Sequence, residues 1–378
     1  MSAFSPVIRP DADGGRAGRG DCAAGAPARP LGIAYVVHTF HAGGLERCAA
    51  YLANQLDRSA FRPVIVCLNR SGAAAEWVTA ADVPIVELRK WAGNDPRAAT
   101  RLARVLKEYR IDLAQSHNWG TLIETSIACR LSGAVHVHAE HGQELNAMPA
   151  GRTRRWLRRA ARQWAFGRCA ATVACAESVR RHLHRAWGFP PCRVEFIPNG
   201  IVAPTADGAA RSRVRRELAV PDDAVVLGSV GRLAAVKDFG TAIRAVAELR
   251  DRTRGDGEAP FLVLVGDGPE REALERVAAA VGASDRVRFA GRRSDVGDCL
   301  AAFDLYVNSS LGEAMSLSIL EAMACGLPVV ATDVGDTAEM LGGRAACGVT
   351  VPAGDASALA AAIDALIREP ERRSVLGR

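Results

Sequence analysis

The sequence lacks three features, and each absence excludes a class of protein. It has no apolar stretch approaching the roughly 18 to 20 residues that a membrane-spanning helix needs. Its first 30 residues contain no apolar segment of the kind found in signal peptides. Its ten cysteines are scattered, and no two stand as C-x-x-C. These absences argue against an integral membrane protein, a disulfide framework and a cysteine zinc site, and they favour reduced thiols in the cytoplasm.

What is present is typical of a globular protein with more than one domain. The chain has 378 residues, of which 49% are hydrophobic and 24% charged, so it can bury a large core. A single core is hard to sustain at this length, which favours two domains of roughly 150 to 200 residues. We expect a disordered tail over residues 1–30, a first domain over 31–203, a hinge over 204–221 and a second domain over 222–378.

Strand-like apolar segments alternate with helical patterns along both halves. The segments that indicate strands are 31–40, 62–69, 84–89, 111–117, 134–141, 171–178 and 194–201, then 224–233, 261–268, 287–292, 304–310 and 327–334. Mostly apolar runs of this length are typical of parallel strands buried on both faces. The alternation predicts an α/β fold of two Rossmann-like doubly wound domains that face each other across a cleft.

Positive charge is concentrated in one segment, since residues 151–193 hold eleven arginines and a single acid. Within 151–168, Trp156, Ala160 and Trp164 recur at helical spacing, and arginines occupy other positions around the helix. Such a basic amphipathic helix can lie on an anionic membrane. The alternative is a solvated helix whose tryptophans pack in the core. Charge alone also suits nucleic acid, but no nucleic-acid-binding motif accompanies it, so no such partner is expected.

Candidate phosphate contacts follow two strands of the second half. Gly266 and Gly268 stand between a strand and a helix, but Arg271 takes the place of the third glycine of the dinucleotide fingerprint. A tight turn and a phosphate contact are equally good interpretations there. Arg232 and Lys237 also follow a strand, beside the start of a helix. Two such cations would hold a diphosphate well, and a solvated surface pair is the alternative.

The stretch 309–330 carries the most informative pattern. Glu313 lies in a loop, where its carboxylate can accept hydroxyl groups of a sugar or simply face solvent. The N–H groups at Ser316 and Leu317 open a helix and are positioned for a phosphate. Glu321 lies in that helix among apolar neighbours and needs a partner, either a ribose diol or a salt bridge.

A histidine ends one strand of the first half. His141 lies at the carboxyl end of the strand 134–141, where it can donate a hydrogen bond or act as a base. A lone histidine is more often structural. His136 and His138 share one face of the same strand, but no set of carboxylates converges with them, so no metal site is expected.

Together these motifs resemble a known family. The Glu313-x7-Glu321 spacing followed by AMACGLPVVATDVG, the GRL and VGDGPER segments and the loop at Gly43 and Gly44 resemble those of the retaining GT-B glycosyltransferases of family 4. The likeness runs from about residue 32 to the end of the chain. More narrowly, the segments GGLER, HNWGTLIE and AEHGQE look like those of sugar transferases in PEP-CTERM/exosortase exopolysaccharide systems.

The resemblance implies a reaction. A sugar would pass from a nucleotide-diphosphate donor to a lipid-linked or polysaccharide acceptor, with retention of configuration, at the inner face of the cytoplasmic membrane. No metal or other cofactor would be needed, because fixed cations and helix dipoles replace magnesium at the leaving diphosphate. The sequence agrees with this expectation, because it has no D-x-D motif at a strand end.

The resemblance also implies a role for each candidate residue. His141 and Glu313 would meet the donor sugar at the reacting centre. Arg292 would lie near the base, and Glu321 would bind the ribose hydroxyls. The full set of donor-binding residues would be Gly43, Gly44, Arg232, Lys237, Arg292, Ser316, Leu317 and Glu321.

Two positions and the C-terminus depart from the family pattern. Ala314 and Asp336 stand where the family usually has glycine, which would reshape the donor loop. The family also continues with a helix that crosses back onto the first domain, so a chain that stops at Arg378 is expected to be truncated. These departures motivate one alternative function, a non-catalytic nucleotide-sugar-binding subunit of a polysaccharide assembly complex. A nucleotide-sugar epimerase of the same fold is the other.

Overall fold

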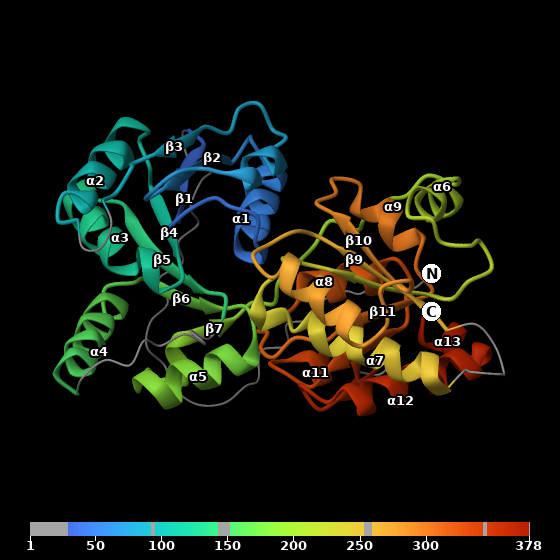
Figure 1. Cartoon of the computed structure of the whole chain (residues 1–378). Helices are drawn as coiled ribbons and strands as arrows, with labels where there is room; N and C mark the ends of the chain where they lie inside the picture. The colour runs from blue at the N-terminus through green and yellow to red at the C-terminus, as the bar shows by residue number, and fades with distance from the viewer. Residues whose placement is uncertain (1–28, 92–94, 143–151, 253–258, 343–345, 378) are drawn as a thin grey trace, which may run out of the picture.

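The computed structural model describes residues 29–91, 95–142, 152–252, 259–342 and 346–377. Within these residues, the first half of the chain forms one parallel sheet flanked by helices (Figure 1). Its strands are β1 (Leu31–Val37), β2 (Phe61–Cys67), β3 (Ile85–Glu87), β4 (Leu113–His117), β5 (Val135–Glu140), β6 (Ala171–Ala174) and β7 (Val194–Phe196). Its helices are α1 (Gly44–Gln55), η1 (Ala73–Trp77), α2 (Ala98–Glu108), α3 (Trp119–Ser132), α4 (Arg152–Phe166), α5 (Glu177–Trp187) and η2 (Pro191–Arg193).

The second half forms a second parallel sheet with its own helices (Figure 1). Its strands are β8 (Val226–Val230), β9 (Phe261–Val265), β10 (Val287–Gly291), β11 (Leu305–Asn308), β12 (Val329–Thr332) and β13 (Gly348–Val351). Its helices are α6 (Ala210–Glu217), η3 (Ala235–Lys237), α7 (Phe239–Arg252), α8 (Arg271–Ala280), α9 (Val296–Ala301), α10 (Leu317–Ala324), α11 (Thr337–Leu341), α12 (Ala356–Arg368) and α13 (Pro370–Leu376).

Both sheets have the strand order of doubly wound domains. The first runs β3-β2-β1-β4-β5-β6-β7 and the second β10-β9-β8-β11-β12-β13. In each, the order reverses beside the first strand, between β1 and β4 and between β8 and β11, and ligands bind such folds at the carboxyl ends of the strands at this reversal. The predicted α/β fold of two Rossmann-like domains is confirmed, because the apolar strands are buried on both faces, as in the fully buried β9.

The segment 204–221, predicted to be a hinge, contains helix α6, which lies beside α9 (Figure 1). Its Arg215 is only 1% exposed and donates hydrogen bonds to the Asp304 carboxylate at 2.7 Å and to the Ala302 carbonyl at 3.0 Å. The helix is therefore attached to the second domain. The composition of the segment concealed this, because its anchoring residue is charged and produces no apolar stripe.

The predicted disordered tail 1–30 falls almost entirely outside the described residues. Arg29 is described, and its guanidinium pairs with the Asp112 carboxylate at 2.8 Å. Asp112 also accepts a hydrogen bond from the Gly32 N–H at 2.7 Å, at the start of β1. This carboxylate therefore joins the residue before the first sheet to the sheet itself.

Asp336 of the second domain contacts the first domain. Helix α5 begins after Ala176, whose side chain cannot cap it. Both oxygens of the buried Asp336 carboxylate instead accept the N–H groups of Glu177 and Ser178, the latter at 2.8 Å. The Asp336 N–H donates to the Ala314 carbonyl at 3.1 Å. One of the two departures from the family pattern is thus a helix cap supplied across the domain boundary.

Candidate functional site

The strand-order reversal of the second sheet brings two predicted site residues together. Lys237 follows β8 in the chain and Glu313 follows β11, the strand beside it. The Lys237 ammonium pairs with a Glu313 carboxylate oxygen, which also accepts the Ser310 hydroxyl at 2.8 Å. The Ser309 hydroxyl donates to the Lys237 carbonyl at 3.0 Å. This arrangement fixes a cation and a carboxylate at the edge where a doubly wound domain binds its ligand.

The glycines at 266 and 268 serve packing at this edge. Gly266 has a φ of +137°, and a Cβ atom there would lie 1.9 Å from the Gly231 carbonyl oxygen. A Cβ atom on Gly268 would lie 2.3 Å from the Leu233 carbonyl oxygen. Both positions require glycine because the loop that carries Arg232 approaches so closely. Of the two interpretations offered by the sequence, the structure favours the turn.

The starts of two helices face each other across the domain boundary. Ser316, which is buried, precedes α10, and Leu317 is its first residue. A Cβ atom on Gly44, the first residue of α1, would lie 3.9 Å from a methyl group of Leu317. Gly43 has an extended backbone and no side chain to cap α1. Two helix N-termini, each with a partial positive charge, therefore meet at this point.

Arg232 lies close enough to the first domain to affect Glu46 in the first turn of α1. Burial raises the pKa of Glu46 to about 6, and the Arg232 guanidinium opposes that rise. Arg232 itself is exposed. The predicted cation of the second domain and the Gly43–Gly44 loop of the first are thus brought together.

Glu321 is buried, and its partner comes from the other domain. The side chain of this residue of α10 is enclosed, and one carboxylate oxygen pairs with the Arg47 guanidinium at 2.9 Å. The same oxygen accepts the Tyr51 hydroxyl at 3.3 Å. Burial raises the pKa of Glu321, and Arg47 opposes that rise. The sequence allows a salt bridge or a ribose diol for this acid. The structure shows the salt bridge, which Glu321 forms with Arg47 of α1.

Arg47 and Tyr51 were not predicted as site residues. The GGLER segment contributes to the family resemblance, but the resemblance implies no role for its arginine. The available signal was the spacing of four residues, which puts both side chains on one face of α1. What could not be seen was that this face meets Glu321, because that contact joins positions 274 residues apart in the sequence.

Arg292 lies against the first domain. Its guanidinium pairs with Glu76 at 2.6 Å and donates to the Ala73 carbonyl at 3.2 Å, both in η1. Among the described residues, no hydrogen bond or ion pair connects it to another predicted site residue. Its role near a nucleobase stays a prediction.

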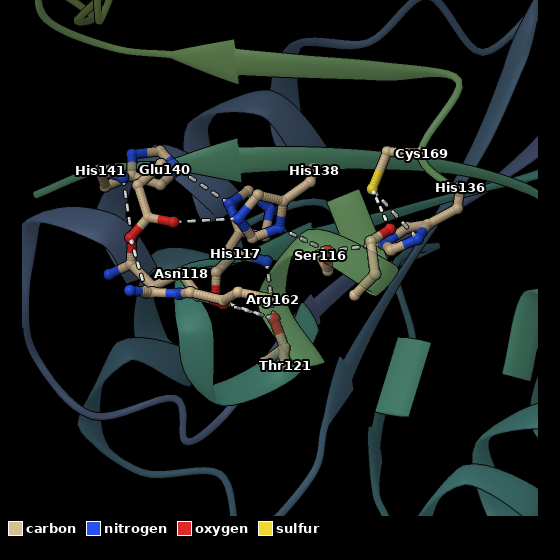
Figure 2. Close-up of polar contacts among 11 residues, drawn as sticks. Ser116, His117, Asn118, Thr121, His136, His138, Glu140, His141, Arg162 and Cys169 are labelled. Carbon is tan, nitrogen blue, oxygen red and sulfur yellow. Dashed lines mark hydrogen bonds and ion pairs between the residues drawn. The ribbon is translucent and has the colours of Figure 1, made fainter. Parts of the chain in front are cut away.

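His141 follows β5 and belongs to a polar cluster inside the first domain (Figure 2). Its Nε2 lies 2.9 Å from Nδ1 of His117, and its backbone N–H donates to the Asn118 side chain at 2.8 Å. Burial lowers the pKa of His141 to about 4 and that of His117 well below its usual value, so both rings are neutral at pH 7. No hydrogen bond within the described residues uses Nδ1 of His141, so this nitrogen is available to a ligand.

The other two histidines of β5 have protein partners. The Ser116 hydroxyl lies 2.8 Å from both His136 Nε2 and His138 Nδ1 (Figure 2). His138 Nε2 lies 3.1 Å from the Glu140 carboxylate, and His136 Nδ1 lies 3.1 Å from the Ser126 hydroxyl. These histidines therefore have the structural role that is usual for the residue.

Helix α4 exposes its tryptophans and buries an arginine. Trp156 is 66% and Trp164 39% exposed, so the alternative in which they pack in the core is wrong. Arg162 is buried, and its guanidinium lies over the rings of Trp187 and Trp119, at 4.0 and 4.6 Å from their centroids. Arg162 therefore packs α4 against the first domain by cation–π contacts, while Trp156 and Trp164 leave aromatic surface exposed on the helix.

Two family models match the chain. The model described as Glycosyltransferase Family 4 matches residues 42–203, and the one described as Glycosyl transferases group 1 matches residues 224–369. The lipopolysaccharide core biosynthesis glycosyltransferase LpsE of Rhizobium meliloti is 39% identical over 173 residues, which are 46% of this chain and 48% of LpsE. The 2-deoxystreptamine glucosyltransferase of Streptomyces kanamyceticus is 29% identical over 257 residues, 65% of each protein. The chain thus spans about half to two thirds of the length of these curated relatives.

A solved structure agrees over most of the chain. Anabaena HepE, crystallised in complex with UDP and glucose, superposes with a TM-score of 0.77 at 21% identity, covering 91% of this chain and 92% of HepE. At this identity the likeness concerns the fold, which is that of the GT-B glycosyltransferases. The chain therefore consists of a glycosyltransferase family 4 domain followed by a glycosyl transferases group 1 domain.

Proposed function

We propose that this protein transfers a sugar from a nucleotide-diphosphate donor to a lipid-linked or polysaccharide acceptor during exopolysaccharide or other cell-surface glycan biosynthesis. The observation that carries the proposal is the pair of Lys237 and Glu313 beside the start of α10. A fixed cation and helix N–H groups would bind the diphosphate, and the carboxylate would accept hydroxyl groups of the sugar. The names of the relatives, which include LpsE, support a role in surface glycans.

The proposed reaction keeps the anomeric configuration and needs no metal. Lys237, Arg232 and the N-termini of α1 and α10 would stabilise the charge that develops on the leaving diphosphate, as a metal does in other transferases. Retention follows when the acceptor attacks from the face that the leaving group vacates. His141, neutral at pH 7, would contact the donor sugar through its available Nδ1.

Calorimetric titration with UDP, GDP and ADP, first without metal and then with magnesium, tests the donor site. We expect one of these nucleotides to bind without metal and magnesium to leave its affinity unchanged. Arg232→Ala should weaken that binding about ten-fold or more, because it removes a cation from the diphosphate. Arg276→Ala, which removes an exposed arginine of α8, is the matched control and should change nothing. Binding that requires magnesium would contradict the metal-independent mechanism, and the absence of binding would contradict the donor site.

The two alternative functions differ in what becomes of a bound nucleotide sugar. A transferase releases the nucleoside diphosphate when an acceptor is supplied. An epimerase returns an isomerised nucleotide sugar without any acceptor. A non-catalytic subunit binds the nucleotide tightly and leaves the sugar unchanged. Chromatography of the products therefore separates the three.

We also propose that α4 holds the protein at the inner face of the cytoplasmic membrane, where a lipid-linked acceptor is found. The proposal is supported by the exposed side chains of Trp156, Leu157 and Trp164, with the exposed Arg159 among them. Tryptophan is favoured at the lipid interface, and arginine is attracted to anionic headgroups. Among the described helices, none is long and apolar enough to span a bilayer, so the contact would be peripheral.

Flotation with vesicles tests this membrane contact. We expect the protein to bind vesicles that contain anionic phosphatidylglycerol more strongly than neutral phosphatidylcholine vesicles, and to be released at high salt. The double substitution Trp156→Ser and Trp164→Ser should abolish most of the binding. The control is Trp91→Ser, because Trp91 is 57% exposed on the first domain but outside α4. Equal losses in the two variants would contradict a specific role for α4.

A further inference from the structure

The contact between Arg47 and Glu321 leaves part of the carboxylate for a ligand. Arg47 and Tyr51 both reach Oε1 of Glu321. No hydrogen bond within the described residues reaches Oε2, and Oε2 is not among their fully covered polar atoms without a partner, so a small part of this oxygen stays accessible although the side chain as a whole is only 3% exposed. Glu321 is therefore fixed at one oxygen by the first domain while its other oxygen is free to accept hydroxyl groups.

Arg47 is itself held in place before it reaches Glu321. Its Nε–H donates to the Tyr51 hydroxyl at 2.8 Å, and its guanidinium lies 5.4 Å from the centroid of the Tyr51 ring and 5.5 Å from that of Trp77. An arginine oriented by two aromatic rings and a hydrogen bond loses little conformational freedom when it meets a carboxylate.

The domains also touch beside this pair. The Asn199 side chain lies 3.5 Å from the Cys48 sulfur of α1 and donates to the Met315 carbonyl, just before α10, at 3.3 Å. The relative placement of α1 and α10 is therefore supported by contacts other than the ion pair, and Arg47 does not have to hold the domains together alone.

Arg47 is also the cation that acts on Glu321. In the described part of the chain, the titratable groups that face Glu321 are Arg47, Cys48 and Tyr51 of α1, Tyr306 of β11 and Cys325 after α10. Burial raises the pKa of both thiols and both phenols, so these four groups are neutral at pH 7. Among these groups the guanidinium supplies the charge that compensates the burial of the carboxylate, and the Tyr51 hydroxyl adds a hydrogen bond.

We infer that Arg47, braced by Tyr51, is a positioning residue of the first domain that orients Glu321 of the second so that its free oxygen binds the ribose hydroxyls of the donor nucleotide. Recognition of the ribose then depends on contact between the two domains, since neither supplies both groups. The inference rests on the proposed function and on the ribose contact that the family resemblance implies for Glu321.

Titration with UDP and with 2′-deoxy-UDP tests the inference. If the wild-type protein prefers GDP or ADP, that nucleotide and its 2′-deoxy form are used instead. The wild type should bind the ribonucleotide about ten-fold more tightly than the deoxynucleotide, because a hydrogen bond to a charged group is lost in the latter. Arg47→Met should weaken binding of the ribonucleotide about 10- to 100-fold and bring the ratio of the two affinities toward one. Arg47→Lys should restore part of both. The matched control is Arg58→Met, which removes an arginine paired with Asp82 in the same domain and should leave the ratio unchanged.

The pH dependence separates positioning from a purely structural role. Without Arg47 the pKa of Glu321 rises further, so protonation removes the acceptor at a higher pH than in the wild type. As the pH is lowered, the nucleotide affinity of Arg47→Met should therefore begin to fall at a higher pH than that of the wild type, whereas the affinity of Arg58→Met should follow the wild type.

Three results would count against the inference. If Arg47→Met binds the ribonucleotide more tightly, Arg47 competes with the ribose. If affinity and ratio are unchanged although the wild type binds, Arg47 has no role in recognition and the proposed function survives. If the wild type binds no nucleoside diphosphate, the proposed function fails and the inference fails with it.

Discussion

Replacing Lys237 with methionine is expected to lower the rate of sugar transfer by about 10²- to 10³-fold. The Lys237 ammonium pairs with Glu313 at the strand-order reversal of the second sheet. Its removal takes a fixed cation from the place where the leaving diphosphate gains charge, and it leaves the partly buried Glu313 without its ion-pair partner. The measurement is steady-state transfer from the nucleotide sugar whose diphosphate binds in the calorimeter.

The first domain offers a matched control. Lys90 pairs with Glu124 at 2.5 Å, and both side chains are about as enclosed as those of Lys237 and Glu313. Lys90→Met removes a comparable ion pair outside the donor site and should leave the transfer rate within about two-fold, since it touches no proposed ligand group. A similar loss of rate in both variants would mean that Lys237 acts through stability alone.

Replacing Arg215 with methionine is expected to lower the free energy of unfolding by about 3–5 kcal/mol. The guanidinium is buried between α6 and the second sheet and donates to the Asp304 carboxylate and to backbone carbonyls. Methionine fills much of the volume but takes the buried donor from the Asp304 carboxylate, which keeps Arg211 and the Val226 N–H, and it removes the guanidinium donor from carbonyl oxygens such as those of Ala302 and Asp222. Urea denaturation followed by circular dichroism measures the change.

Arg211→Met is the control for this prediction, because Arg211 pairs with the other oxygen of the same carboxylate. The Arg211–Asp304 distance is 2.6 Å, but the arginine side chain is 44% exposed. Solvent-exposed pairs contribute about 0–1 kcal/mol, so this variant should remain close to the wild type. Equal destabilisation by the two substitutions would show that burial of Arg215 is not what matters.

Much of the fold could be predicted from the sequence because its signals are local. Apolar runs such as 261–268 have the length of buried strands, and their alternation with helical patterns is sufficient for a doubly wound sheet. The proximity of Lys237 and Glu313 follows from the same pattern. Both residues follow strands, and the carboxyl ends of parallel strands lie at the same edge of the sheet.

What could not be predicted depends on contacts between distant segments. The partner of Glu321 is Arg47 of the other domain, whereas the sequence leaves both a salt bridge and a ribose open. The outward direction of Trp156 is also not fixed by periodicity, because a buried arginine takes the core-facing side of α4. A hydrophobic pattern predicts the wrong buried face of a helix where a charged residue is buried, as Arg162 is.

The cap that Asp336 places on α5 links the unfolding of the two domains. Helix α5 belongs to the first domain, but two of its first N–H groups are satisfied by a carboxylate of the second. If the second domain loses its structure, these groups lose their acceptor, and a cap of this kind is worth about 1 kcal/mol. The stability of α5 therefore depends in part on the folded state of the second domain. This dependence favours unfolding of the two domains in one cooperative transition over two independent transitions.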